Sequence, residues 1–239
     1  MKEKDPAKIL GGISGGRILD AATGYGNTIM QLKDSLKDFD EIIGIDTVPA
    51  GPVLEKARSV FDGKKIKYMR MDAAELDFPS GSFDTVSMGN SLHHLSKPAQ
   101  ALKEMFRVLK HGGTLIVNEV YRDGQTEEEM THVLLHHWWA KIDSKLGITH
   151  NETYIRGEIL KMIGGLGLSR TDDFDITDRS DPFDRERLDM IIGTFEMYHK
   201  KAEELEDREE LIAEGQKLKD MIGRKGFRWA KMLLVIGKK

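Results

Sequence analysis

The chain of 239 residues contains no cysteine, and this absence removes several kinds of chemistry at once. No disulfide can form, and neither a thiolate metal site nor an iron–sulfur cluster can be built from these side chains. Mechanisms that need a cysteine nucleophile are excluded for the same reason.

The sequence also lacks an excess of either charge and lacks long apolar runs. Its 36 basic residues stand against 40 acidic ones, giving a net charge of −4 and a pI near 6.1. This balance is not the basic excess typical of nucleic-acid binding, so we expect no nucleic-acid partner. No apolar run approaches the roughly 20 residues of a membrane span, and the first residues, Met-Lys-Glu-Lys-Asp-Pro, lack the apolar core of a signal peptide. We therefore expect one cytoplasmic domain, residues 1–239, without membrane contact; its oligomeric state stays open, and a homodimer is compatible with the sequence.

The most informative feature present is a short apolar strand that ends on an acid and breaks into a glycine turn. The segment Arg17–Asn27 reads Arg-Ile-Leu-Asp-Ala-Ala-Thr-Gly-Tyr-Gly-Asn. Gly24 and Gly26 have no Cβ, so the backbone can turn sharply and a ligand can approach the main chain closely. A helix over Asn27–Leu36 would then present its free N–H groups to that ligand. The pattern predicts a nucleotide site, although two glycines after a strand also fit a plain tight turn.

Three further predicted strands end in polar groups. They are Glu41–Asp46, Ile66–Met71 followed by Asp72-Ala73, and Phe83–Met88 followed by Gly-Asn90-Ser-Leu-His-His94. Asp46 lies about twenty residues after the glycine turn, the spacing at which a βαβ unit places a carboxylate beside a ribose. A helix over Pro98–Leu109 and a strand over Thr114–Glu119 complete the core that we expect over 17–120.

Together these segments resemble the class I S-adenosylmethionine (SAM) dependent methyltransferases, most closely the small-molecule branch similar to the ubiquinone/menaquinone biosynthesis methyltransferases. The resemblance rests on Leu-Asp-Ala-Ala-Thr-Gly-Tyr-Gly, Gly-Ile-Asp46, Met-Asp72-Ala-Ala-Glu-Leu-Asp-Phe-Pro, Ser-Phe-Asp-Thr-Val with Ser-Leu-His-His-Leu, and Arg107-Val-Leu-Lys-His-Gly-Gly-Thr-Leu. It implies an α/β fold with a Rossmann-like, doubly wound sheet of seven strands whose last strand is antiparallel. We expect that strand within Phe227–Ile236 and the sixth near Arg170–Ile176.

The resemblance also implies SAM as methyl donor, S-adenosylhomocysteine as product, and a small-molecule acceptor methylated at O, C or N. The residues that it assigns to the cofactor are Asp20, Ala22, Gly24, Gly26, Asp46, Thr47, Val48, Asp72, Ala73 and Asn90. Asp20 would act through its charge on the cofactor's amino group, Asp46 would hold the ribose, and Asp72 would accept from the adenine amino group. Asn90 would lie at the methyl end.

Two adjacent histidines follow the fourth strand, and they are the candidate catalytic residues. Methyl transfer from a sulfonium is an in-line displacement that mainly requires alignment and exclusion of water. A phenol or enol acceptor must also lose its proton, which a positioned histidine can take near neutral pH. His93 and His94 are placed to do so. The alternative is that His94 packs against the sheet and His93 faces solvent.

Two helical insertions, about 126–147 and 182–222, are expected to form a lid over the cofactor. The first begins with a capping box at Thr126–Glu129. We expect His137, Trp138 and Trp139 to line an aromatic, partly polar substrate pocket. Core packing of both tryptophans is the alternative.

A metal site on the first insertion is a further alternative. His132 and His136 are four residues apart on one helical face, with His150 as a third possible ligand. The local pattern supplies no carboxylates for a metal-dependent O-methyltransferase, and we expect no metal.

Two other functions stay open. The third glycine of a dinucleotide-binding motif is missing, because Ile29 occupies its place, and this counts against an NAD-linked oxidoreductase. A non-catalytic SAM-binding protein would carry the same motifs.

Overall fold

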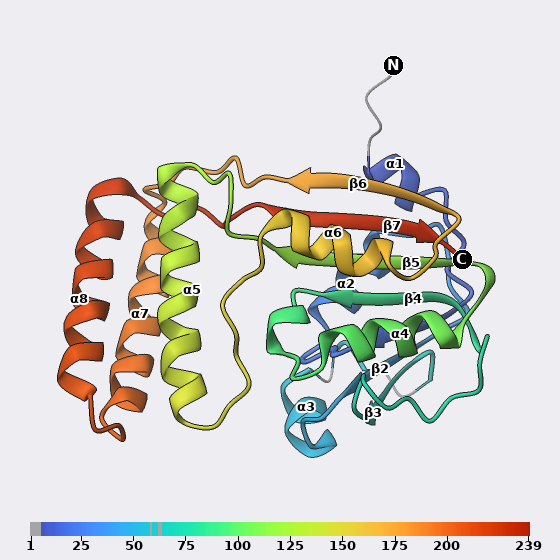
Figure 1. Ribbon diagram of the computed structural model, residues 1–239, viewed down its shortest axis with the longest axis horizontal. Coiled ribbons are helices and arrows are strands. Elements are labelled where there is room, and N and C mark those ends of the chain that lie inside the picture. Colours follow the sequence, from blue (N-terminus) through green and yellow to red (C-terminus); the bar gives the residue numbers. More distant parts are fainter. Residues whose placement is uncertain (1–5, 58, 62–63) are drawn as a thin grey trace.

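The computed structural model describes residues 6–57, 59–61 and 64–239, and a single mixed sheet forms its centre. Seven strands pair in the order β3-β2-β1-β4-β5-β7-β6 (Figure 1). Their bounds are β1 Arg17–Ala21, β2 Glu41–Asp46, β3 Ile66–Arg70, β4 Phe83–Gly89, β5 Leu109–Val120, β6 Arg170–Ile176 and β7 Met232–Lys238.

The last strand runs against its two neighbours. β7 is antiparallel to β5 and to β6, whereas β1 to β5 pair in parallel. The predicted seven-stranded sheet with an antiparallel last strand is therefore confirmed. β7 begins at Met232, later than the predicted Phe227, because Phe227 is fully buried in a separate helical core and its N–H donates to the Pro182 carbonyl.

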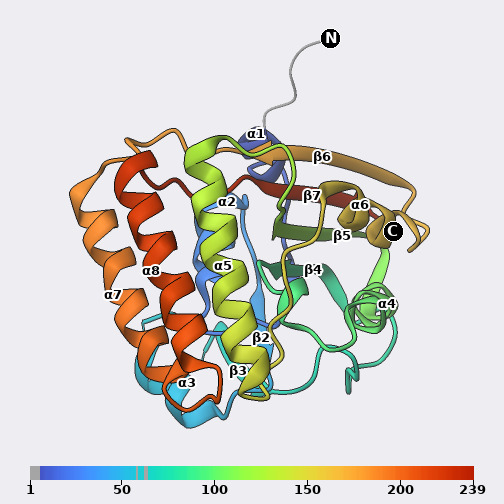
Figure 2. The same cartoon turned by 60° about the vertical axis from the view of Figure 1, so that its left-hand side comes forward.

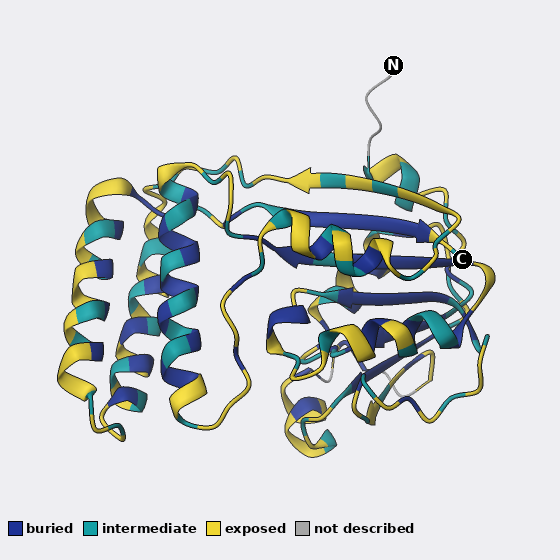
Figure 3. Cartoon of the chain, viewed as in Figure 1, coloured by how far each residue is buried: buried dark blue, intermediate teal, exposed yellow. Residues whose placement is uncertain are grey.

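Helices cover both faces of the sheet, as a doubly wound fold requires. On one face lie α1 Pro6–Leu10, α2 Asn27–Ser35 and α3 Ala50–Lys56, and on the other lie α4 Pro98–Val108 and α6 Arg156–Gly164. The inner strands of the sheet are mostly buried, whereas the two edge strands, β3 and β6, are mostly exposed (Figure 3). Among the described helices, none is long and apolar enough to cross a bilayer.

Three long helices form a bundle beyond the carboxyl ends of β4 and β5 (Figures 1 and 2). They are α5 Glu127–Lys145, α7 Arg185–Ala202 and α8 Arg208–Lys225. The predicted capping box starts α5: the Thr126 side chain accepts from the Glu129 N–H, and the Glu129 carboxylate accepts from the Thr126 N–H. The bundle has an apolar core of its own, and its outward faces are exposed (Figure 3).

Trp138 lies inside this bundle core, which corrects its assignment to a substrate pocket. Its side chain is 1% exposed, its Nε1 donates to the Leu211 carbonyl at 2.9 Å, and its ring lies 5.4 Å from that of Phe195. The core-packing alternative is thus the correct one for Trp138.

The chain returns from α5 to α6 through residues 146–155, which run between the bundle and the sheet in Figure 1. Asn151 fastens this segment to the end of β4, because its N–H and its side-chain amide both donate to the His93 carbonyl, at 2.8 and 3.0 Å. Further along, the Arg122 N–H donates to the Tyr154 carbonyl beyond β5.

Close packing between α5 and α8 depends on one glycine. A Cβ added to Gly215 would lie 2.5 Å from the Trp138 ring, whereas one added to Gly223 on the same helix would meet nothing within 4 Å. We expect Gly215→Ala to destabilise the protein by about 1–3 kcal/mol through overpacking. Gly223→Ala should stabilise it by about 0.5–1 kcal/mol, because alanine restricts the unfolded chain. Urea unfolding of both variants checks this, and stabilisation by both would contradict the packing argument.

Candidate functional site

The loop after β1 presents its main chain to open space. Ala22, Gly24 and Gly26 all have positive φ angles, of 52°, 52° and 82°. A Cβ on Gly26 would lie 2.7 Å from Val60, so no side chain fits there without movement. A Cβ on Gly24 would meet nothing within 4 Å, although its backbone conformation also favours glycine. The loop is therefore closely packed at Gly26 and open at Gly24.

Asp46, at the end of β2, holds this loop. Its Oδ2 accepts from the Gly24 N–H at 2.9 Å, and its Oδ1 accepts from the Val48 N–H at 3.1 Å. Each carboxylate oxygen has room for a second hydrogen bond. Asp46 can thus fix the loop and still accept from a ligand's hydroxyl groups.

Asp20 is completely buried beneath the same loop. Its two oxygens accept from the Thr23 hydroxyl at 2.6 Å and from the Ser87 hydroxyl at 2.7 Å. Burial raises the pKa of Asp20 to about 6; the two hydroxyl bonds only partly offset this, and the charge of Asp46 adds to the rise. Both of these hydrogen-bond donors to the Asp20 carboxylate are neutral, so neither compensates its charge.

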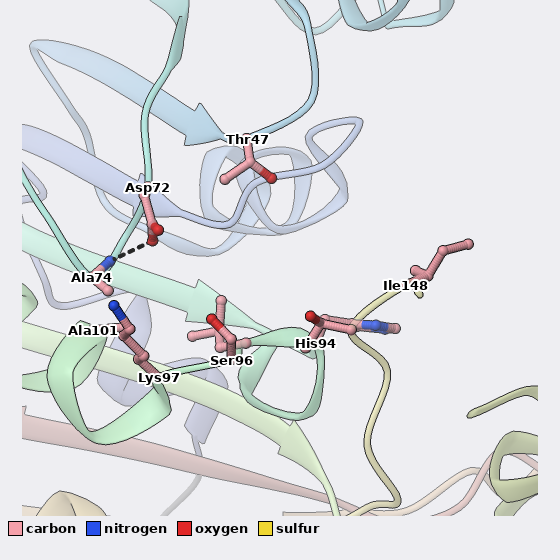
Figure 4. Close-up of a pocket in the computed structure, with 10 residues that line it drawn as sticks. Thr47, Asp72, Ala74, His94, Ser96, Lys97, Ala101 and Ile148 are labelled. Carbon is pink, nitrogen blue, oxygen red and sulfur yellow. Dashed lines mark hydrogen bonds between the residues drawn. The ribbon is translucent and has the colours of Figure 1, made fainter. Parts of the chain in front are cut away.

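A cavity of about 310 Å³ lies beyond the ends of β2, β3 and β4, and we call it the Asp72 cavity. Its lining residues are Thr47, Asp72, Ala74, His94, Leu95, Ser96, Lys97, Ala101, Ile148 and Thr149. Figure 4 shows Thr47 and Asp72 on one side and Ser96 and His94 on the other. Asp72 accepts from the Ala74 N–H at 2.8 Å through one oxygen, which caps the turn after β3.

The remaining predicted cofactor residues lie around this edge of the sheet. Ala73 is buried, 4% exposed, in the main core. Asn90 is exposed just after β4 with a φ of 50°, and its N–H donates to the Asn118 carbonyl at 2.6 Å.

Four histidines come together beside the Asp72 cavity, and we call them the histidine cluster. His93 and His94 belong to a short 3₁₀ helix, Leu92–His94, His136 lies on α5, and His150 lies in the 146–155 segment. One ring nitrogen of each lies within 4.8 Å of the others. The cluster joins the sheet, the bundle and the connecting segment.

Glu119, at the end of β5, positions His93. One carboxylate oxygen accepts from the Ser91 and Leu92 N–H groups, at 2.9 and 2.8 Å, and the other pairs with His93 Nδ1. Both side chains of this pair are fully buried. Sequence reasoning assigned no function to Glu119, since its partners lie 26–28 residues away.

His150 has a carboxylate partner of the same kind. Its Nδ1 lies 2.8 Å from Asp143 Oδ2, and Asp143 also accepts from Tyr198 and Lys201, at 2.8 and 2.7 Å. Burial alone would raise the pKa of Asp143, but the hydrogen bonds from His150, Lys201 and Tyr198 outweigh it and hold the pKa at about 2. Sequence reasoning considered His150 only as a third metal ligand and missed Asp143.

Three ring nitrogens of the cluster have no hydrogen-bond partner among the described residues. His93 Nε2, His136 Nδ1 and His150 Nε2 are buried without a hydrogen-bond partner in the described chain. Burial, helped by repulsion from His93 and His150, lowers the pKa of His94 to about 3 and takes that of His136 further below its ordinary value. His94 and His136 are therefore neutral near pH 7, and His94 is a weak general base.

The two predicted catalytic histidines differ in exposure. His93 is fully buried, and His94 is exposed and lines the Asp72 cavity. The alternative, in which His94 packs inside and His93 faces solvent, is therefore wrong.

The three histidines of the first insertion have different surroundings. His132 stands apart from the cluster, because its Nδ1 accepts from the Ala230 N–H at 2.9 Å. His137 donates to or accepts from the Thr153 hydroxyl at 2.9 Å and lines a second cavity of about 360 Å³ together with His150. Trp139 stacks on Tyr198, with ring centroids 5.5 Å apart.

The strand order with antiparallel β7, the glycine loop and the acids after β2 and β3 define a fold of the class I SAM-dependent methyltransferases. In agreement, residues 19–117 match the family described as "Methyltransferase domain". Residues 19–117 therefore form a methyltransferase domain of this SAM-dependent family, distantly related to the demethylmenaquinone methyltransferases.

The relatives share the domain rather than the whole length. A demethylmenaquinone methyltransferase of Thermus thermophilus is 34% identical over 103 residues, which cover 43% of this chain and 46% of that protein. The chain thus spans about half the length of this curated relative.

Among solved structures, the YcgJ protein from Bacillus subtilis is 20% identical with a TM-score of 0.60, covering 98% of this chain and 95% of that one. A Haemonchus contortus phosphoethanolamine N-methyltransferase 2, in complex with phosphomonomethylethanolamine and S-adenosylhomocysteine, is 17% identical with a TM-score of 0.59, covering 98% and 52%. At these identities the likeness concerns the fold.

The raised pKa of Asp20 makes a prediction about stability. Because the folded protein binds the Asp20 proton more tightly than the unfolded chain, this residue's contribution to stability falls as the pH rises from about 4 to about 6. The loss at neutral pH amounts to about 3 kcal/mol. Asp20→Asn should therefore gain stability relative to the unmodified protein by up to about 3 kcal/mol more at pH 7.5 than at pH 4. Urea unfolding at both pH values measures the difference; a difference that does not change with pH would rule out a raised pKa.

Proposed function

We propose that this protein transfers a methyl group from SAM to a small-molecule acceptor, at an O, C or N atom. The observation that carries the proposal is that Asp46 at the end of β2 binds the glycine loop through Gly24, while the next residue, Thr47, lines one cavity together with Asp72. The methyltransferase domain match over 19–117 covers the same elements.

In this proposal the adenosine part of SAM lies against β2 and β3. Asp46 accepts from the ribose hydroxyls with the lone pairs that Gly24 and Val48 leave over. Asp72 accepts from the adenine amino group with the oxygen that does not bind Ala74. Thr47, Val48 and Ala73 complete the adenine side.

The methionine part of SAM lies over the glycine loop, beside Ala22, Gly24 and Gly26. Its ammonium group would supply the positive charge that the buried Asp20 lacks. Because Thr23 and Ser87 enclose Asp20, this interaction acts through the field or a bridging water. Asn90, exposed at the end of β4, lies at the methyl end.

Alignment and exclusion of water do most of the catalytic work in such a transfer. The bundle and the 146–155 segment stand over the carboxyl edge of the sheet, where they can cover the reacting groups (Figure 2). His137 and Trp139 remain proposed pocket residues, and Trp138 does not. For acceptors that must lose a proton, His93 and His94 stay the candidate bases: His94 lines the Asp72 cavity but has a low pKa, and His93 is oriented by Glu119 but fully buried.

Two variants test the cofactor assignment. Asp46→Ala removes charge-assisted hydrogen bonds worth about 1.5–3 kcal/mol each, so SAM affinity should fall at least tenfold. Asp72→Ala should also weaken binding, whereas Asp77→Ala, at an exposed acid of the same segment, should leave it unchanged. Isothermal titration with SAM and S-adenosylhomocysteine measures all three.

The same titration, together with an acceptor screen for turnover, separates the alternative functions. Binding of NADH without SAM would revive the oxidoreductase, and SAM binding with no turnover over a wide acceptor screen would favour a non-catalytic SAM-binding protein. Equal SAM affinities for the Asp46→Ala and Asp77→Ala variants would overturn the ribose assignment.

Binding of SAM should also release protons near pH 6. The incoming ammonium stabilises the ionised form of Asp20 and so lowers its pKa. Titrations at pH 6 in two buffers of different ionisation enthalpy should then give different apparent binding enthalpies. Asp20→Asn should remove this part of the difference; an unchanged difference in the variant would mean that Asp20 does not sense the cofactor.

A further inference from the structure

The cofactor assignment leaves the histidine cluster largely unexplained. Three of its four members, His93, His136 and His150, are at most 5% exposed, and each keeps a ring nitrogen without a partner in the described chain. A buried polar atom without a partner is costly and calls for an explanation such as a bound ion. Here three of them belong to one small group of neighbouring rings.

We propose that His93, His94, His136 and His150 bind a divalent transition-metal ion, with Zn²⁺ as the preferred occupant. The proposal does not rest on the methyl-transfer assignment, although it would remove His93 as a candidate base. It differs from the metal site considered in the sequence analysis, which paired His136 with His132, because His132 is occupied by the Ala230 N–H. It also revises the expectation of no metal.

The carboxylates around the cluster fit this role. Glu119 binds His93 through Nδ1, and Asp143 binds His150 through Nδ1, so the Nε2 atoms are the ones that remain without partners. In protein metal sites a ligating histidine almost always donates its other ring N–H to a carboxylate, a carbonyl or water, which fixes the tautomer and the ring orientation. The structure contains two such histidine–carboxylate pairs, His93 with Glu119 and His150 with Asp143.

The donor set selects the kind of metal. Neutral imidazole nitrogens suit Zn²⁺, Cu²⁺, Fe²⁺ and Ni²⁺, whereas Mg²⁺ and Ca²⁺ prefer oxygen ligands. In a tetrahedral zinc site with Zn–N distances near 2.0–2.1 Å, ligand nitrogens lie roughly 3.4 Å apart. The nitrogens of the cluster lie within 4.8 Å of one another, so small side-chain adjustments would close the site.

The position of the site indicates what the ion would do for the fold. His93 and His94 follow β4, His136 belongs to the bundle, and His150 belongs to the connecting segment, so one ion would join three separate parts of the chain. His94 also lines the Asp72 cavity, and His150 lines the cavity that contains His137. The ion would thus lie between the two cavities.

The experiment measures metal binding and thermal stability of the full chain without SAM. After removal of metals with a chelator and dialysis, Zn²⁺ should bind at one ion per chain by elemental analysis. It should raise Tm by roughly 5–10 °C when free Zn²⁺ is about 100 times Kd. X-ray absorption of the zinc-loaded protein should show nitrogen ligands near 2.0–2.1 Å.

Two histidine variants provide the comparison. His150→Ala should bind Zn²⁺ at least tenfold more weakly and lose most of the Tm rise, whereas His111→Ala, at an exposed histidine on β5, should behave like the unmodified protein. If His150→Ala fails to fold, His94→Ala, which changes the exposed member of the cluster, gives the same comparison.

Two results would overturn the proposal. One is less than a tenth of an equivalent of bound Zn²⁺ with no Tm change in the unmodified protein. The other is an equal loss of zinc binding in the His111→Ala and His150→Ala variants. Neither result would affect SAM binding, which is measured separately.

Discussion

The arrangement around the candidate site depends on one buried carboxylate, Glu119. After β4 the chain leaves the sheet through Asn90 in a left-handed conformation, and the next two N–H groups, of Ser91 and Leu92, bond to a side chain of β5. Glu119 accepts from two of them and holds the ring of His93. The His93 carbonyl in turn accepts from Asn151, which fixes the connecting segment and brings His150 to the cluster. A single side chain thus links the end of the sheet to the segment that crosses it.

Two other buried acids show what a carboxylate needs in this environment. Asp143 has three donors, two of them able to carry positive charge, and its pKa is held at about 2. Asp20 has only two neutral hydroxyl donors, and its pKa rises to about 6. The contrast is physical: hydroxyl groups offset the cost of burying the charge only in part. A nearby cation would lower the pKa of Asp20 again, as Lys201 does for Asp143.

The features that the sequence predicted are those with local signals. The strands and the acids at their ends follow from apolar runs of four to six residues, and the Thr126 capping box from residues three apart. The contacts of Glu119, Asp143 and His150 join separate elements, and a local sequence pattern cannot predict such contacts. The helix α5 is buried on several sides, so its sequence does not show which face packs in the bundle, and the prediction for Trp138 was wrong for that reason. His132 and His136 look equivalent in the sequence, although only His136 belongs to the histidine cluster.

The two roles open to His93 exclude each other, and this bears on the acceptor. A proton or a metal ion can occupy its Nε2, but not both, since Glu119 already occupies Nδ1. As ligands of the proposed ion, neither His93 nor the neighbouring His94 would be free to take a proton. Four histidines around a tetrahedral ion leave no position for an acceptor, so an acceptor methylated beside a loaded cluster would have to be nucleophilic already. Occupation of the cluster would therefore narrow the suitable acceptors to those that need no histidine base.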